Sequence, residues 1–222
     1  MKVACFTDIH GAVQQVTQTI EGLTEIHLVI LGGDLTAQGR PEEAEEILDR
    51  CEAALKRNAA DHIPILAVSG NMDSPEVDQY LNARGVSLNG QGVQIGPVGF
   101  FGVSACPPSP LHTPYEVSES ELAAWIKQGF RKVAQAPLRV LVSHTPPWDT
   151  KVDRVYSGIH AGSHSVREFV LREQPALVIC GHIHEARGQD RLEQSLVLNC
   201  GPARSGHYAL VEIDEAIEIE AR

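Results

Sequence analysis

Along the first third of the chain, apolar and polar residues follow two different patterns in turn, one typical of strands and the other of helices. Short apolar runs rich in β-branched residues are typical of buried strands. They lie at 3–6, 26–31 and 63–68. Between them, two segments repeat apolar side chains every three or four positions, which predicts amphipathic helices at 13–23 and 41–57. Pro41 suits a first helical turn, so this part of the chain is expected to fold as an α/β sheet.

The rest of the chain continues this alternation after a segment of different character. A helix is expected from Ser74 to Gly85, and the glycine-punctuated residues 85–104 predict antiparallel hairpin strands. Residues 106–115 hold four prolines and are expected to form an irregular loop. The later elements are expected as a helix from the capping box at Ser118 and Glu121 to residue 136, strands at 139–142, 177–180, 196–198 and 208–213, a loop at 145–162 and a helix at 163–171. Because no linker or repeat interrupts the pattern, residues 1–222 are expected to form a single domain.

Charge and cysteine content narrow the classes of partner and location. The 222 residues include 18 Lys and Arg against 29 Asp and Glu, a formal net charge of −11, and no block of basic residues. Nucleic acid and anionic membranes bind a concentrated positive face, so neither is an expected partner. The five cysteines are odd in number and never spaced as C-x-x-C, and the opening MKVACFTDIHG lacks the apolar core of a secretory signal. A cytoplasmic location is therefore expected, and a homo-oligomer stays open.

Side chains able to bind a metal follow the predicted strands at five places, each beside a glycine or a turn. The motifs are DIH at 8–10, GGD at 32–34, GNMD at 70–73, SHT at 143–145 and GHIH at 181–184. Ligands bind outside the carboxyl ends of strands in open α/β sheets, so these side chains are expected to meet.

The metal-binding candidates form a mixed set of oxygen and nitrogen donors without sulfur. They are Asp8, His10, Asp34, Asn71, His144, His182 and His184. Such a set suits Mn, Fe, Zn, Co or Ni. Seven donors are too many for one ion and suffice for two divalent ions that share a carboxylate. Taken singly, an Asp or Asn here could belong to a turn and a His to the core, so the argument depends on the whole set.

The ordered set D-x-H, GD, GN, H and GH-x-H resembles that of the calcineurin-like metallophosphoesterase superfamily. The ending GHIHEARG is similar to its small bacterial and archaeal phosphoesterase branch, related to cyclic-nucleotide phosphodiesterases. The resemblance implies a four-layer α/β/β/α sandwich that hydrolyses a small phosphoester. It implies one ion on Asp8, His10, Asp34 and His184, and a second on Asp34, Asn71, His144 and His182. It also implies that a hydroxide bridging the ions at Asp34 attacks phosphorus, because metal coordination lowers the pKa of water.

One position departs from the pattern of this superfamily. Many members carry GNH followed by an acid, and that histidine can protonate the leaving group, whereas the thioether of Met72 cannot. Weak activity on general monoesters and a preference for phosphodiesters or activated esters are therefore expected. Asn71 is also a candidate for substrate contact. Asp73 is expected to cap the helix at Pro75 or to brace a metal ligand.

The loop at 145–162 holds the remaining candidates. Trp148 and Tyr156 are candidates for stacking on the substrate, and His160 is a candidate for the missing acid. In the alternative interpretation, Trp148 packs the loop down and His160 is solvated.

Two other functions stay open at this point. One is a nucleotidase or nuclease of the same fold, although such substrates usually recruit a basic groove. The other is a protein-binding scaffold that has lost activity, similar to a retromer subunit of the superfamily. A scaffold predicts eroded ligands, whereas all seven donors are present here.

Overall fold

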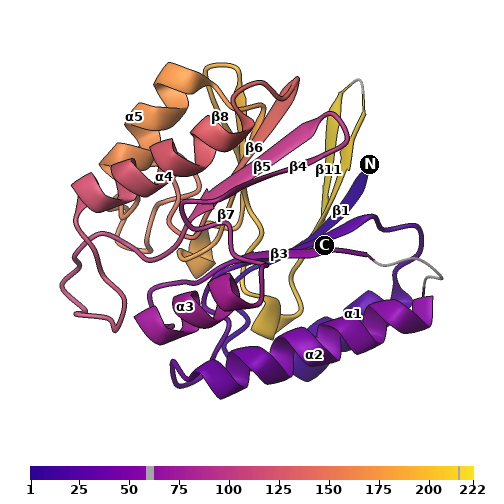
Figure 1. Ribbon diagram of the computed structural model, residues 1–222. Coiled ribbons are helices and arrows are strands. Elements are labelled where there is room, and N and C mark those ends of the chain that lie inside the picture. The colour runs from indigo at the N-terminus through magenta and orange to yellow at the C-terminus, as the bar shows by residue number, and fades with distance from the viewer. Residues whose placement is uncertain (59–62, 215) are drawn as a thin grey trace.

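The strands of the computed structural model form two packed sheets (Figure 1), and the structure describes residues 1–58, 63–214 and 216–222. The first sheet has the order β11-β10-β1-β2-β3 and the second the order β4-β5-β6-β7-β9-β8. The first sheet comprises β1 (Lys2–Phe6), β2 (Leu28–Gly32), β3 (Ile65–Val68), β10 (Ala209–Ile213) and β11 (Ile217–Ala221). The second comprises β4 (Gly92–Ile95), β5 (Val98–Val103), β6 (Leu138–Ser143), β7 (Leu177–Cys180), β8 (Gly188–Leu192) and β9 (Ser195–Asn199).

Helices cover the outer face of each sheet. The helices are α1 (Val13–Gly22), α2 (Pro41–Asn58), α3 (Pro75–Ala83), α4 (Glu119–Val133) and α5 (His164–Glu173), with short 3-10 helices η1 (His184–Ala186) and η2 (Ala203–Ser205). In Figure 1, α1 and α2 lie beyond the first sheet, and α4 and α5 lie on the opposite side, beyond the second. The predicted four-layer α/β/β/α sandwich is therefore confirmed.

Apolar clusters fill the spaces between these layers. Successive side chains of a strand point to opposite faces, and β1 uses both faces. Ala4 and Phe6 pack with the helices α1 and α2, whereas Val3 and Cys5 pack against the second sheet. Burial on both faces explains why the central strands appear in the sequence as unbroken apolar runs.

Parallel pairing places the ends of the site-bearing strands together. In the first sheet β1 pairs in parallel with β2, and β2 with β3, while in the second β6 pairs in parallel with β7. The loops after β1 and β2 stay joined beyond the sheet, because the N–H groups of Asp8 and His10 donate to the carbonyl oxygens of Gly33 and Asp34 at 2.9 and 2.8 Å. The segments that carry the metal-binding motifs are thus held in register by backbone hydrogen bonds.

The predicted elements are largely confirmed, with two strands missed. The capping box of Ser118 and Glu121 opens α4 as expected, and β4 and β5 form the predicted antiparallel hairpin. The strand β5 also pairs in parallel with β6, which makes the hairpin an edge of the second sheet. The missed strands are β8 and β11. The sequence of β11 alternates Ile and Glu, a period-two pattern that could have identified it.

The expected helix cap at Asp73 is wrong. Ser74 is the N-cap of α3, and its side chain accepts a hydrogen bond from the N–H of Val77. Asp73 instead turns inward, where it braces residues beside the site.

The five cysteines are free and buried. Among the described residues, no helix combines the length and the apolar character that crossing a membrane requires.

Candidate metal centre

The seven predicted donors follow the ends of strands in both sheets and meet at one place. Asp8 and His10 follow β1, Asp34 follows β2 and Asn71 follows β3. The second sheet contributes its donors from the ends of β6 and β7, namely His144, His182 and His184. Hydrogen bonds and short ionic contacts connect all seven side chains into one cluster.

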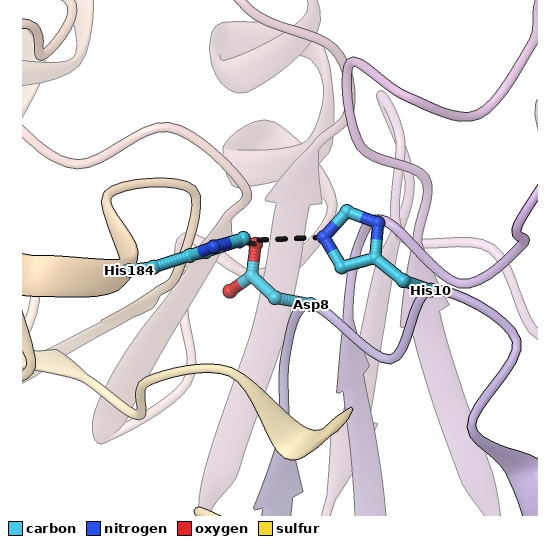
Figure 2. Close-up of side chains that lie close together, drawn as sticks. All are labelled: Asp8, His10 and His184. Carbon is cyan, nitrogen blue, oxygen red and sulfur yellow. Dashed lines mark hydrogen bonds and ion pairs between the residues drawn. The ribbon is translucent and has the colours of Figure 1, made fainter. Parts of the chain in front are cut away.

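The first half of the cluster is a triad of Asp8, His10 and His184 (Figure 2). Nε2 of His184 lies 3.2 Å from Oδ1 of Asp8 and 3.3 Å from Nε2 of His10. Asp8 is fully buried, whereas the side chains of His10 and His184 keep 16% and 30% of their surface exposed. The triad therefore combines the buried carboxylate of Asp8 with two partly exposed imidazoles.

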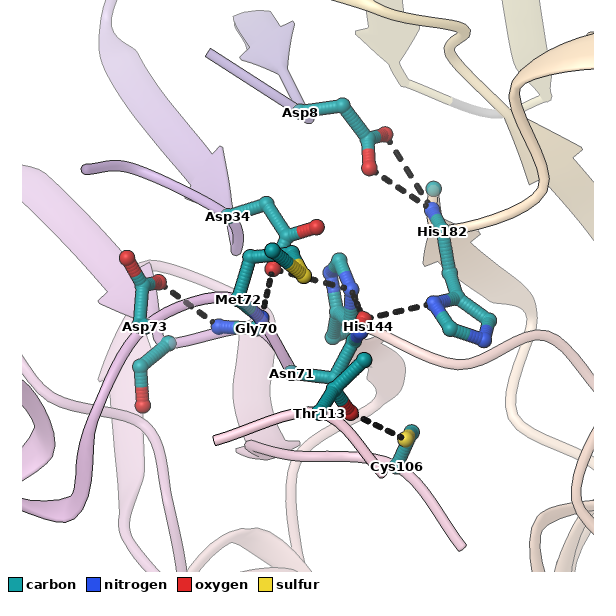
Figure 3. A network of polar contacts seen from close by, with 12 residues as sticks. Asp8, Asp34, Gly70, Asn71, Met72, Asp73, Cys106, Thr113, His144 and His182 are labelled. Carbon is teal, nitrogen blue, oxygen red and sulfur yellow. Dashed lines mark hydrogen bonds and ion pairs between the residues drawn. The ribbon is translucent and has the colours of Figure 1, made fainter. Parts of the chain in front are cut away.

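The second half gathers around the amide oxygen of Asn71 (Figure 3). Oδ1 of Asn71 lies 2.9 Å from Nε2 of His144 and 2.7 Å from Nδ1 of His182. His144 is fully buried, and its Nδ1 lies 3.0 Å from the carbonyl oxygen of Gly32.

Asp34 lies between the two halves. Its Oδ2 is 3.6 Å from Nε2 of His10, and its Oδ1 is 3.5 Å from Nε2 of His144. Asp8 also approaches the second half, because ligand atoms of Asp8, Asp34 and His144 lie within 4.8 Å of one another. Both carboxylates are thus close to both halves. The sequence predicts this of Asp34 but assigns Asp8 to the first ion alone.

The backbone around these donors is unusual and sterically closed. Asp8, His10, Asp34 and His182 adopt positive φ angles of 54°, 47°, 50° and 68°. Such conformations cost of the order of 1–3 kcal/mol each and concentrate at functional sites. Gly70 must be glycine, since a Cβ there would clash with Oδ1 of Asp34.

Hydrogen bonds from the backbone fix the carboxylates. The N–H of His182 donates to both oxygens of Asp8 at 3.0 and 3.1 Å. Oδ1 of Asp34 accepts from the N–H of Met72 at 2.7 Å. The buried carboxylate of Asp73 accepts from backbone N–H groups on both sides of the site, those of Leu35, Thr36 and Gly70. Asp73 therefore ties the Asp34 loop to the Asn71 loop, which supports its predicted bracing role.

The two central carboxylates have opposite electrostatic surroundings. Burial raises the pKa of Asp8, but a hydrogen bond from His184 and the charge of His144 outweigh it and lower the pKa to about 2. Burial raises the pKa of Asp34 to about 6, against the attraction of His144 and with the repulsion of Asp8. A positive charge between the two carboxylates would relieve this repulsion.

The imidazoles are prepared to differing degrees for metal binding. Burial lowers the pKa of His10 to about 4 and that of His182 to about 3, and nearby positive charges add to both shifts. Burial also disfavours the charged form of His144, but the carboxylates of Asp34 and Asp8 outweigh it and raise its pKa. His10 and His182 are therefore neutral at pH 7 and offer the lone pairs that a metal requires.

The hydrogen-bond inventory of the second half fits a cation. A carbonyl oxygen only accepts, so Nδ1 of His144, facing Gly32, carries the ring hydrogen. Nε2 then either carries a second proton, which the raised pKa of His144 favours, or points a lone pair at Oδ1 of Asn71, which is also an acceptor. Acceptors facing one another need a shared proton or a cation between them. Mixed oxygen and nitrogen donors of this kind suit a divalent transition metal.

The candidates from the loop at 145–162 lie in different surroundings. Trp148 stacks on His164 at 4.4 Å between ring centroids, and Tyr156 is 93% exposed. His160 is not solvated, because its Nδ1 lies 2.6 Å from the buried Oδ1 of Asp153 and its Nε2 accepts from Arg154 at 3.2 Å. Within the described residues, no hydrogen bond or ring contact joins these three candidates to the seven donors.

The comparisons with known proteins agree with this geometry. A family model described as calcineurin-like phosphoesterase matches residues 1–186. The chain belongs to this family. This family consists of metal-dependent phosphoester hydrolases, as the motifs of the chain predicted. We refer to the chain below as the phosphoesterase.

Similar proteins cover almost the whole phosphoesterase. An uncharacterized protein of Methanocaldococcus jannaschii is 29% identical over 206 residues, which are 91% of this chain and 88% of that protein. A crystal structure from Thermus thermophilus superposes with a TM-score of 0.73 at 16% identity, covering 99% of this chain and 98% of that one. A dimetal phosphatase from Danio rerio gives a TM-score of 0.67 at 14% identity, covering 100% and 96%. These two structures show the same fold.

One residue beside the site escaped the sequence analysis. Arg204 lies in η2, and a nitrogen of its guanidinium is 3.3 Å from Nδ1 of His184. The metal-binding motifs end at residue 184, and a single arginine twenty positions later gives no signal by itself. Its position depends on how the chain returns from β9 toward β1, where the N–H of Ala203 donates to the carbonyl oxygen of Thr7 at 2.8 Å.

Proposed function

We propose that this phosphoesterase hydrolyses phosphodiesters, or esters with good leaving groups, with two divalent ions bound by the seven donors. The first ion would use Asp8, His10, Asp34 and His184. The second would use Asp34, Asn71, His144 and His182. The observation that carries the proposal is the position of Asp34, whose two oxygens face His10 in one half and His144 in the other.

The pair of ions would polarise the phosphoryl oxygens and lower the pKa of a water so that it can attack at neutral pH. The protein's own residues hold this arrangement rigid. Asp34 is fixed by the N–H of Met72, and Asp8 by the N–H of His182. The partly exposed imidazoles of His10 and His184 leave the site open to substrate. Asn71 lies at the centre of the second half and is also proposed to contact the substrate.

The preference for diesters or activated esters rests on position 72. Met72 is 39% exposed, and its side chain carries no ionisable hydrogen. An alkoxide leaving group needs a proton donor far more than a phenolate does. His160 does not supply the proton in this proposal, since its Nδ1 hydrogen is held by Asp153 and its Nε2 is an acceptor.

The test is hydrolysis of an aryl phosphodiester and the matching aryl monoester by metal-free protein titrated with Mn²⁺. The proposal expects activity that requires the metal and is higher on the diester. Absence of metal-dependent hydrolysis would favour the protein-binding scaffold instead. Cleavage of oligonucleotides or nucleoside monophosphates in preference to the aryl diester would favour the nuclease or nucleotidase.

A further inference from the structure

Arg204 lies beside the metal centre, with its guanidinium next to His184. Its side chain is exposed, and in the described part of the chain no carboxylate forms an ion pair with it. Its backbone is fixed to the site, because the N–H of Arg204 donates to the carbonyl oxygen of Asp8 at 3.4 Å. The guanidinium therefore extends from a rigid base beside the triad of Asp8, His10 and His184.

A pocket of about 470 Å³ opens next to this arginine. It begins at Gly11, the residue after His10, and Arg50 of α2 contributes a second guanidinium to its lining. The remaining polar lining consists of glutamines from α1, namely Gln14, Gln15 and Gln18. Arg50 has one exposed partner, Glu46, at 3.3 Å, and exposed pairs of this spacing are weak. The pocket is thus a local positive region on a chain whose net charge is −11.

The contact between Arg204 and His184 constrains which nitrogen of the His184 ring carries the hydrogen. Guanidinium nitrogens donate and never accept, so Nδ1 of His184 must be the acceptor in this contact. If Nε2 of His184 binds a cation, a neutral ring carries its hydrogen on Nδ1, and two donors would then face each other at 3.3 Å. A cation on Nε2 of His184 would therefore leave the guanidinium of Arg204 available to another acceptor.

We infer that Arg204 and Arg50 form an anion subsite that binds a second phosphoryl group of the substrate. The preferred substrates are then phosphoesters that carry another phosphate within one pocket length of the reacting one, such as diphosphate esters or bisphosphates. This inference rests on the proposed function, because it places the reacting phosphate at the metal pair. Planar guanidinium groups bind phosphate oxygens through paired hydrogen bonds.

The test compares two non-hydrolysable probes on manganese-loaded protein by isothermal titration calorimetry. Inorganic phosphate reports the metal pair alone, and methylenebisphosphonate adds a second phosphoryl group. The wild type should bind the bisphosphonate about tenfold more tightly or better, as expected for charge-assisted hydrogen bonds. Arg204→Gln and Arg50→Gln should each reduce this preference roughly threefold to tenfold. Arg191→Gln is the matched control, since Arg191 is exposed on β8 and its guanidinium donates to the carbonyl oxygen of Gln194.

The variants separate the subsite from other effects. All of them keep the seven donors, so any removal of manganese by the bisphosphonate is common to every protein, and metal content is measured after each titration. Equal affinities of the wild type for the two probes would overturn the inference, as would an unchanged preference in both pocket variants. If aryl diester hydrolysis persists while this preference is absent, the subsite fails and the proposed function stands. If the preference is present but hydrolysis is absent, the proposed function fails and the subsite stands.

Discussion

The backbone N–H of Met72 donates a hydrogen bond of 2.7 Å to Oδ1 of Asp34, and Met72 as a residue is 39% exposed. Position 72 therefore supports the shared carboxylate through its main chain alone. The side chain is free to change without disturbing the contacts of Asp34. This separation makes position 72 suited to a gain-of-function test.

Met72→His should raise hydrolysis of an alkyl phosphomonoester by about tenfold to a hundredfold, since a positioned proton donor contributes ~10²–10⁴ where the leaving group is poor. Hydrolysis of an aryl diester should change by less than about threefold, because a phenolate leaves without a proton. Steady-state rates on both substrates measure the effect. Met72→Leu is the control, and an equal gain in that variant would show that shape and not proton donation is responsible.

Asp34→Asn should remove the stabilisation that metal gives to the fold. At a manganese concentration a hundred times the dissociation constant, binding stabilises the native state by about 2.7 kcal/mol, or roughly 5–10 °C in Tm for a chain of this length. Asp34→Asn should lose most of this shift, because the amide cannot offer two anionic oxygens to both halves of the cluster. Thermal unfolding with manganese and with chelator measures it. Asp49→Asn removes the same charge from an exposed position on α2 and should keep the full shift.

The sequence predicted the seven donors because their placement follows from local rules. A polar residue after a buried parallel strand lies at the sheet edge, so Asp8, Asp34 and His144 could be assigned from apolar runs alone. Contacts between segments far apart in the chain could not be predicted from the sequence. The position of Arg204 depends on the path of the chain after β9, and the contact of His160 depends on Asp153 being enclosed by its own loop.

His160→Ala should lower stability and leave catalysis nearly intact. The fully buried carboxylate of Asp153 accepts from His160 at 2.6 Å and from the N–H of Thr150 at 2.9 Å. Removing the imidazole takes a partner from a buried charge, which costs about 1–3 kcal/mol. The rate on an alkyl diester, whose leaving group is poor, should stay within about twofold, since a general acid would be worth far more there. His160→Asn keeps a donor and should recover part of the stability, whereas a large loss of rate in both variants would return His160 to the mechanism.

Glu119→Gln should destabilise the fold in a pH-dependent way, because Glu119 of α4 caps the neighbouring helix α5. Its carboxylate accepts from the N–H groups of His164 and Ser165 at 2.9 and 3.0 Å, and from the hydroxyl of Ser163 at 2.6 Å. Loss of such a cap costs about 1–2 kcal/mol. Burial raises the pKa of Glu119, but these hydrogen bonds outweigh it and hold the pKa below the ordinary value of 4.5.

A carboxylate with a lowered pKa stabilises the folded state fully above its ordinary pKa, and this contribution is lost as the pH falls through the folded-state value. The free energy of unfolding should therefore separate the wild type from Glu119→Gln at pH 7 and bring them together below pH 4.5. Urea unfolding at pH 7, 4 and 3 measures the difference. Glu168→Gln, an exposed change on α5 itself, should unfold like the wild type at pH 7. A gap between the wild type and Glu119→Gln that stays constant down to pH 3 would show that the side chain acts through packing and not through its charge on the helix end.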